Sequence, residues 1–331
     1  MPSRRAVAPV LSIIAALACA EGCSVSRGRP GDPLPRAGDE MSAAGVLFHT
    51  GTRVVLWNDP GGFDAYRHHR RFEPEKAGPR QAPDRVSRYG SFRGGLPEDV
   101  ARRIRERGWS IEELRRTVRQ VVIHFDACGS SRRCFEVLHD IRGLSSHFLL
   151  DLDGTVYQTL DLKERAWHAA EANDLSIGIE IANIGAHGDE EALRRWYTRD
   201  AEGTRITFPK ELGDPGLPAD FVGRPRRADP VRGVVNGKDL VQYDFTEEQY
   251  RALESLLLAL SRVFPRIRAD APRGAGGKVL DHAIGSEALK TFEGLIGHHH
   301  VTVEKVDPGP AFDWERVIDH LRREGVPGGA E

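Results

Sequence analysis

Two short stretches that lie far apart in the chain carry side chains of the kinds that bind metal ions. His124 lies in the apolar run 121–125, and 174 residues later Gly297-His298 is followed by Lys-Val-Asp-Pro-Gly-Pro at 305–310. Two imidazoles and the carboxylate of Asp307 supply three protein ligands. A catalytic zinc ion uses three protein ligands and keeps its fourth position open for water. The residue types therefore predict a hydrolytic zinc site.

A glutamate and a lysine accompany these ligands. Glu180 stands in the alternating segment 176–182, and Lys305 lies two residues before Asp307. Zinc lowers the pKa of a bound water to about 7. Glu180 is predicted to take the proton of that water and pass it to the leaving group. Lys305 is predicted to offset the negative charge of the tetrahedral oxygen. The alternative for Glu180 is an ordinary surface position on a half-exposed strand.

The elements that must position these residues alternate between helix and strand. Ile177, Ile179 and Ile181 share one face of segment 176–182, which places Glu180 and its small neighbours on the other. Ser110 and Glu113 form a capping box, Thr246 and Gln249 cap a further helix, and Asp153-Gly154 suits a hairpin turn. Further helices are predicted at 97–107, 134–142, 247–264 and 313–323, and strands at 46–48, 54–57 and 121–125.

Five sequence motifs follow one another in a fixed order. They are the strand histidine His124, the hairpin 146–158, the Arg-Ala-Trp-His-Ala turn at 165–169, the strand 176–181 and the closing run 297–314. In this order they resemble the type 2 zinc-dependent N-acetylmuramoyl-L-alanine amidases, which share their fold with peptidoglycan recognition proteins and phage lysozyme-amidases. The resemblance covers roughly residues 116–184 and 295–321.

The resemblance implies an α/β fold with a mixed central sheet flanked by helices. It also implies Zn²⁺ bound by His124, His298 and Asp307, with hydrolysis of the bond between the lactyl group of muramic acid and L-alanine. The nine-residue spacing of His298 and Asp307 departs from the forms of this loop in the family. His299 and His300 follow directly, so the choice of ligand within the triplet stays open.

The Trp-His turn could contribute to substrate binding. Trp167 could stack on a sugar or peptide face, and a core position is an equal alternative. His168 could contact substrate or hydrogen-bond its own turn. Ala169 ends this turn where glycine is usual in the family.

The N-terminus has the order of charge and apolar residues that is typical of a secretory leader. Arg4 and Arg5 precede the apolar stretch 6–17, and residues 16–19, Ala-Leu-Ala-Cys, resemble a lipoprotein cleavage box. We expect export to the periplasm or cell envelope with lipidation of Cys19, and ordinary signal cleavage is the alternative. No later apolar run approaches the roughly 20 residues that span a bilayer. Membrane contact is therefore expected only through such a lipid.

Cys128 and Cys134 form the second pair of cysteines. A disulfide between them needs an oxidising compartment, which the leader would provide. A similarly spaced bridge in peptidoglycan recognition proteins supports the pairing through the resemblance. Two free thiols are the alternative, and a second metal site is less favoured because no further ligands accompany them.

The domain organisation follows from composition. A leader at 1–19 precedes a Gly-, Pro- and Arg-rich tether and partly ordered extension at 20–96, and the amidase domain is expected at 97–325. A polar insertion at about 186–243 is long for a simple connection and could form a lid or a groove wall. The 331 residues include 47 basic and 49 acidic side chains, so the overall charge does not suggest a nucleic-acid partner. A monomer is expected.

Three functions fit these observations. The leading hypothesis is a zinc amidase that acts on peptidoglycan or muropeptides. The alternative is a peptidoglycan-binding protein that recognises the stem peptide without cutting it, although such members of the fold lose zinc ligands. A third is a zinc hydrolase for another amide, which the sequence does not separate from the first.

Overall fold

The computed structural model of the chain describes residues 30–67, 71–72 and 91–329. The described residues from 37 onward form one compact unit, and the described part of the preceding unit, 30–36, contains neither helix nor strand. The predicted leader and Cys19 lie outside the described residues. No helix in the described part of the chain is both long and apolar enough to cross a membrane.

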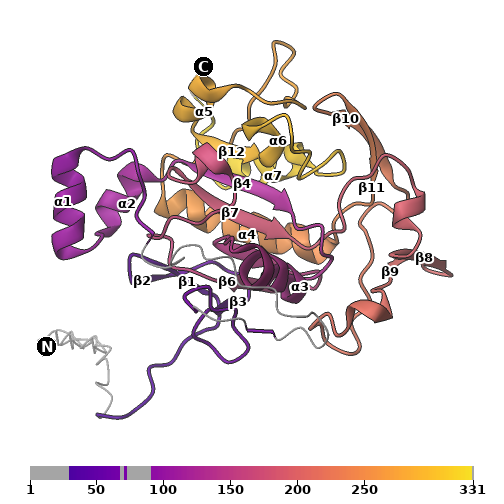
Figure 1. The fold of residues 1–331 in the computed structure, drawn as a ribbon, viewed down its shortest axis with the longest axis horizontal. Coiled ribbons are helices and arrows are strands. Elements are labelled where there is room, and N and C mark those ends of the chain that lie inside the picture. The colour runs from indigo at the N-terminus through magenta and orange to yellow at the C-terminus, as the bar shows by residue number, and fades with distance from the viewer. Residues whose placement is uncertain (1–29, 68–70, 73–90, 330–331) are drawn as a thin grey trace, which may run out of the picture. The chain divides into compact units, whose positions relative to one another are not determined.

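A six-stranded mixed sheet forms the centre of the compact unit (Figure 1). Its neighbouring pairs are parallel except for β5 and β6, which form the predicted antiparallel hairpin. In spatial order the strands are β12 (Gly294–Gly297), β4 (Gln120–Phe125), β7 (Ser176–Ile181), β5 (Phe148–Leu150), β6 (Val156–Gln158) and β3 (Val54–Leu56). The predicted fold class, α/β with a mixed central sheet, is confirmed.

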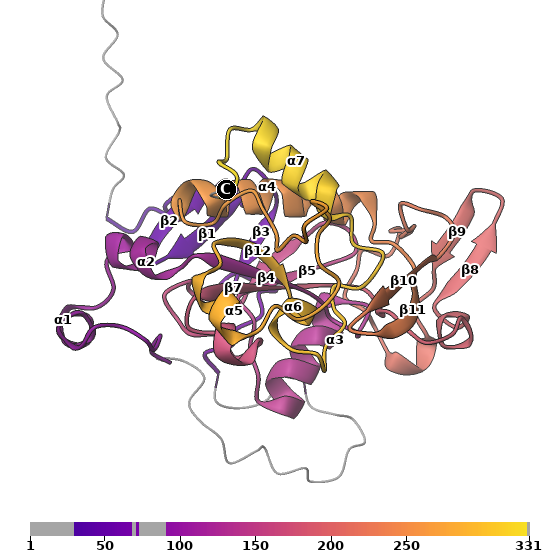
Figure 2. The ribbon, with the colours of Figure 1, turned by 90° about the horizontal axis from the view of Figure 1, so that it is seen from above.

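Helices cover both faces of this sheet. Figure 2 shows α4 (Glu247–Val263) and α7 (Trp314–Arg323) on one side, and α3 (Ser131–Phe135) and α5 (Ser286–Thr291) on the other. The apolar stripe of α4 is buried against the face of β7 that carries Ile177, Ile179 and Ile181. The opposite face of β7 is therefore left for Glu180, as its alternation predicts.

The local signals for helices are confirmed. Ser110 caps α2 (Ile111–Thr117) and Thr246 caps α4, each through a complete capping box. Helix α1 (Glu98–Arg107) follows Pro97. The predicted helix at 134–142 begins earlier, because the Ser130 side chain caps α3, which continues as a π-helix, η1 (Glu136–Arg142).

Segments outside the central motifs add six hairpin strands and one edge strand of the central sheet. In the predicted extension, β1 (Glu40–Ala43) and β2 (Val46–His49) form a hairpin, and β3 joins the central sheet. The compact unit therefore begins before Pro97. The insertion forms two antiparallel hairpins, β8 (Tyr197–Asp200) with β9 (Gly203–Ile206) and β10 (Val231–Val235) with β11 (Lys238–Gln242). Both lie at the end of the molecule opposite α1 and α2 (Figure 1).

Candidate active site

Three adjacent parallel strands bring the predicted residues together. β4 lies between β12 and β7, and His124 pairs directly with Glu180 across the two strands. Both side chains lie on the same face because they occupy paired positions. His298 follows β12 immediately, at the same end of the sheet as His124, since parallel strands end at a common edge.

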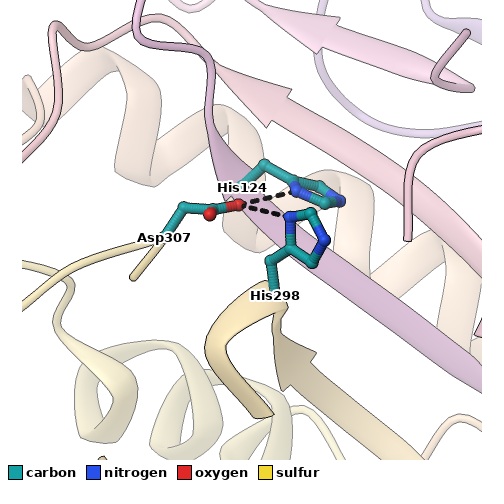
Figure 3. A group of neighbouring side chains, drawn as sticks. All are labelled: His124, His298 and Asp307. Carbon is teal, nitrogen blue, oxygen red and sulfur yellow. Dashed lines mark hydrogen bonds and ion pairs between the residues drawn. The ribbon is translucent and has the colours of Figure 1, made fainter. Parts of the chain in front are cut away.

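The predicted ligands converge on one point. The Nδ1 atom of His124 lies 2.7 Å from Oδ2 of Asp307, and Nδ1 of His298 lies 3.0 Å from the same oxygen. Figure 3 shows both imidazole rings directed toward this carboxylate. All three side chains are buried, and their potential ligand atoms lie within 4.8 Å of one another.

The charge states of this cluster suit a divalent cation. Burial, with the neighbouring His298, lowers the pKa of His124 to about 4, so its imidazole is neutral at pH 7. Burial alone would raise the pKa of Asp307, but hydrogen bonds from His124 and His298 outweigh it and hold that pKa far below the usual range. Metal ligation requires a neutral imidazole and an ionised carboxylate. The donor set therefore fits zinc, which binds nitrogen and carboxylate oxygen ligands.

The other two histidines of the triplet turn away from this point. His300 accepts a hydrogen bond from the backbone N–H of Gly297 at Nδ1 and contacts the Leu280 carbonyl at Nε2. His299 directs its ring nitrogens to the backbone carbonyls of Asp307 and Leu280. Of the three, His298 is the one whose ring joins His124 and Asp307.

His168 supports His124 from the far side of the ring. Its Nδ1 lies 3.0 Å from Nε2 of His124, and its Nε2 lies 3.3 Å from the Ser176 hydroxyl. A histidine that binds a metal through Nδ1 keeps its proton on Nε2, so His168 would be the acceptor that fixes this tautomer when a metal is bound. Gly178 leaves room for the ring: a Cβ at this position would lie 2.7 Å from His168. The ring therefore contacts His124 rather than its own turn.

A cavity of about 620 Å³ opens over the cluster. The predicted residues Glu180 and Lys305 line it together with His124, His298 and Asp307. Trp167 lines it too and is exposed, so a core position for this side chain is wrong. The Arg165 guanidinium lies 4.3 Å from the centre of the Trp167 ring and holds it at the rim.

The family model for N-acetylmuramoyl-L-alanine amidase matches residues 114–310, more than half of the chain. The chain belongs to the N-acetylmuramoyl-L-alanine amidase family. The matched segment contains the whole candidate site, from β4 through the insertion to Asp307.

Among curated proteins, a relative of this amidase-family chain is the 1,6-anhydro-N-acetylmuramyl-L-alanine amidase AmpD of Haemophilus influenzae. The two are 20% identical over 197 residues, which cover 57% of this chain and 64% of the relative. The chain thus spans less than two thirds of that relative's length.

Two solved structures illustrate how distant the structural likeness is. A selenomethionine derivative of AmpD is 19% identical to this chain, with a TM-score of 0.31. The match covers 62% of this chain and 85% of the AmpD chain. AmiD from E. coli, in complex with anhydro-N-acetylmuramic acid-L-Ala-D-γ-Glu-L-Lys, is 18% identical with a TM-score of 0.36, over 64% of this chain and 59% of its own.

The electrostatics of the amidase cavity distinguish Glu180 from Asp307. Burial and the nearby carboxylates of Asp307 and Asp126 raise the pKa of Glu180 well above its usual value, although Lys305 acts in the opposite direction. A carboxylate with a raised pKa is a stronger base than an exposed one. The pKa values of the two acidic side chains of the site are therefore shifted in opposite directions.

The predicted disulfide is not formed in the structure, where Cys128 and Cys134 are free thiols. Cys134 is buried, and its pKa is raised well above the usual value by burial and by a hydrogen bond between the two thiols. Their proximity is compatible with a bridge, and the disulfide stays a prediction.

Several amidase residues near the site were not predicted from the sequence. Arg142, at the end of η1, lines the cavity. Arg93 is fully buried and donates to the carbonyls of Ser176 and Leu162 beside the site. Burial raises the pKa of Asp126 to about 7, although its carboxylate accepts three backbone N–H groups, two from the loop after β4 and one from the loop after β7. An isolated arginine or aspartate in a sequence gives no sign of such partners.

Proposed function

We propose that the protein is a zinc-dependent amidase that hydrolyses the bond between N-acetylmuramic acid and L-alanine in peptidoglycan or muropeptides. The observation that carries the proposal is the buried convergence of His124, His298 and Asp307 beneath a cavity that also holds Glu180 and Lys305. Membership of the N-acetylmuramoyl-L-alanine amidase family supports the choice of this amide bond. The Haemophilus relative is named as an amidase of the same bond in anhydromuramyl compounds.

His124, His298 and Asp307 would hold the zinc ion, and His168 would orient His124. When bound, zinc supplies a Lewis acid that lowers the pKa of water and polarises a carbonyl oxygen. Glu180 would accept the proton of the attacking water and return it to the departing nitrogen of L-alanine. Trp167 and His168 stand at the cavity wall, where the glycan or peptide would lie.

Lys305 would stabilise the negative charge that develops on the carbonyl oxygen. Lys305 lines the cavity, and among the described residues its side chain forms no hydrogen bond or ion pair. Such a charge acts mainly in the transition state, so the turnover number depends on it more than binding does.

Replacement of Lys305 by alanine should lower kcat by about 10²-fold while KM changes much less, in line with the loss of one preorganised donor. Steady-state kinetics on a defined muramyl peptide measure both parameters. Lys278→Ala, at an exposed position outside this cavity, is the matched control and should behave like the wild type. Equal activity of Lys305→Ala and Lys278→Ala would remove Lys305 from the mechanism.

Product analysis tests the reaction itself. Incubation of the zinc-loaded protein with purified sacculi and with a muramyl peptide should give new L-alanine amino termini and peptide-free muramic acid. New reducing sugar ends would show a glycosidase instead. Binding to sacculi without any cleavage would favour a recognition protein, and cleavage of the small substrate alone would indicate a role in muropeptide turnover.

The cellular setting is part of the proposal. A substrate in the cell wall agrees with export to the periplasm or envelope, and a leader ending at Cys19 would provide both the route and a lipid anchor. An oxidising compartment would allow the bridge between Cys128 and Cys134. We propose that the protein acts as a monomer.

A further inference from the structure

The second hairpin of the insertion, β10–β11, does not line the catalytic cavity. Among the described residues that line this cavity, none belongs to the segment 186–243. The hairpin instead contacts the chain between His298 and Ala311, which carries two metal ligands and Lys305. It contacts this segment, called here the ligand loop, at two places.

The first contact is made by Asn236 at the tip of the hairpin. Its side-chain Nδ2 donates to three backbone carbonyls of the ligand loop: His299 at 3.1 Å, Thr302 at 3.2 Å and Lys305 at 2.7 Å. The loop begins with the four-residue helix α6 (His298–Val301). The last carbonyls of a helix lack partners within it. The His299 carbonyl belongs to this helix, and the other two follow it, so one amide group joins the end of α6 to the chain before Asp307.

The orientation of this amide is fixed by its other contacts. Oδ1 of Asn236 accepts the backbone N–H of Ala283 at 3.0 Å, so only Nδ2 can face the three carbonyls. Its own backbone N–H donates to the carbonyl of Asp281. Asn236 and Gly237 form the two-residue turn of the hairpin, with a φ of 48° at Asn236. Asparagine tolerates this left-handed conformation, which most side chains avoid.

The second contact is made by Gln242 at the end of β11, which is fully buried. Its Nε2 donates to the carbonyl of Pro308 at 3.0 Å, and its Oε1 accepts the N–H of Ala311 at 3.0 Å. The approach is so close that a Cβ on Gly309 would lie 2.2 Å from Oε1. The hairpin thus holds the ligand loop on both sides of Asp307.

We propose that the β10–β11 hairpin positions the active site, with Asn236 as the residue that holds His298, Lys305 and Asp307 in register with His124. The proposal rests on the proposed zinc amidase function. It assigns the hairpin a supporting role behind the ligand loop, in place of the lid or groove wall expected from the length of the insertion 186–243. Asn236 is a positioning residue, because its contacts are with the backbone that carries the functional side chains.

Two variants of Asn236 separate the effect of its Nδ2 donor from the effect of the left-handed turn. Asn236→Asp keeps the size of the side chain but directs a carboxylate oxygen at three carbonyls. Asn236→Gly removes the side chain and retains the left-handed turn without strain. Asp239→Asn, an exposed change of one charge on the same hairpin, is the matched control. Circular dichroism and thermal melting of the full chain verify that each variant is folded.

Zinc titration is the first readout and requires no substrate. Both Asn236 variants should bind Zn²⁺ about 10-fold to 100-fold more weakly than the wild type, the range found for residues that orient metal ligands. Asp239→Asn should bind like the wild type. Hydrogen exchange of the zinc-free protein is the second readout. The N–H groups of His299, Thr302 and Lys305 should exchange faster in Asn236→Gly, whereas those of β4 and β7 should not change.

A double-mutant cycle with Lys305→Ala is the third readout. At saturating zinc, Asn236→Gly should lower kcat with little effect on KM. The same change should have a smaller effect in a Lys305→Ala background, because part of it acts through the position of that ammonium group.

Unchanged zinc affinity and unchanged exchange in the ligand loop of folded Asn236→Gly would overturn the proposal. If the effects of Asn236→Gly and Lys305→Ala on kcat are additive, Asn236 does not act through the position of Lys305. If the wild type cleaves no muropeptide, the proposed function fails, and the zinc and exchange measurements still decide whether the hairpin positions the loop.

Discussion

Replacement of His124 by alanine should abolish zinc binding and reduce kcat/KM by about three orders of magnitude or more. A catalytic metal ion typically contributes several kcal/mol of transition-state stabilisation, and each 1.4 kcal/mol or so is tenfold in rate. His124 is buried on the central strand β4, so no other side chain can easily replace its Nδ1 atom. Elemental analysis after gel filtration measures the bound metal, and single-substrate kinetics measure the rate.

His299→Ala and His300→Ala are informative comparisons for this experiment. Both rings bond to backbone atoms, so these variants should retain zinc near stoichiometric amounts while losing some thermal stability. A deleted hydrogen-bond partner leaves buried polar groups unsatisfied, at a cost of about 1–3 kcal/mol each. Retention of metal by His124→Ala, together with its loss from either of these variants, would show that the ligand set is assigned wrongly.

The sequence was sufficient for the elements that carry a local signal. The alternation of residues 176–182 predicted which face Glu180 occupies, because the three isoleucines share the opposite face, which packs against α4. The capping boxes at Ser110 and Thr246 predicted where two helices begin. The ligand pair His124 and His298 was predicted from residue type and motif order, and the parallel register of β12 and β4 brings the two together.

The choice between His298 and its two neighbours required the structure. Three consecutive histidines carry the same chemistry, and only the direction of each ring distinguishes a ligand from a partner of the backbone. The short helix α6 points His298 toward Asp307 and the others toward Leu280. A sequence pattern contains no information on such directions in a helix of a single turn.

The insertion was the least predictable part. Asn236-Gly237 directly after two valines indicates a hairpin turn, and that signal was present in the sequence. The ligand-loop partners of the Asn236 side chain, however, lie more than 60 residues away in the chain. Contacts of this kind depend on how distant segments pack, so the supporting role of the hairpin could be inferred only from the assembled fold.

Replacement of Glu180 by alanine should leave zinc bound while reducing kcat by about 10²-fold to 10⁴-fold, the range for loss of a general acid–base group. Glu180 lines the cavity beside His124 but does not belong to the cluster of three potential ligands. Burial raises its pKa, which suits a group that must accept a proton and then release it to the leaving nitrogen. Glu180→Gln tests the same point with almost no change in volume.

Three measurements on the same protein samples make this prediction specific. Zinc content and binding to sacculi should match the wild type in both Glu180 variants, because Glu180 is proposed to move a proton and does not belong to the cluster of potential ligands. Turnover of a muramyl peptide should fall in both. Glu106→Gln, an exposed position on α1, is the matched control and should remain fully active. Full turnover by Glu180→Gln would mean that another group moves the proton, whereas loss of zinc from Glu180→Gln would place this carboxylate among the ligands.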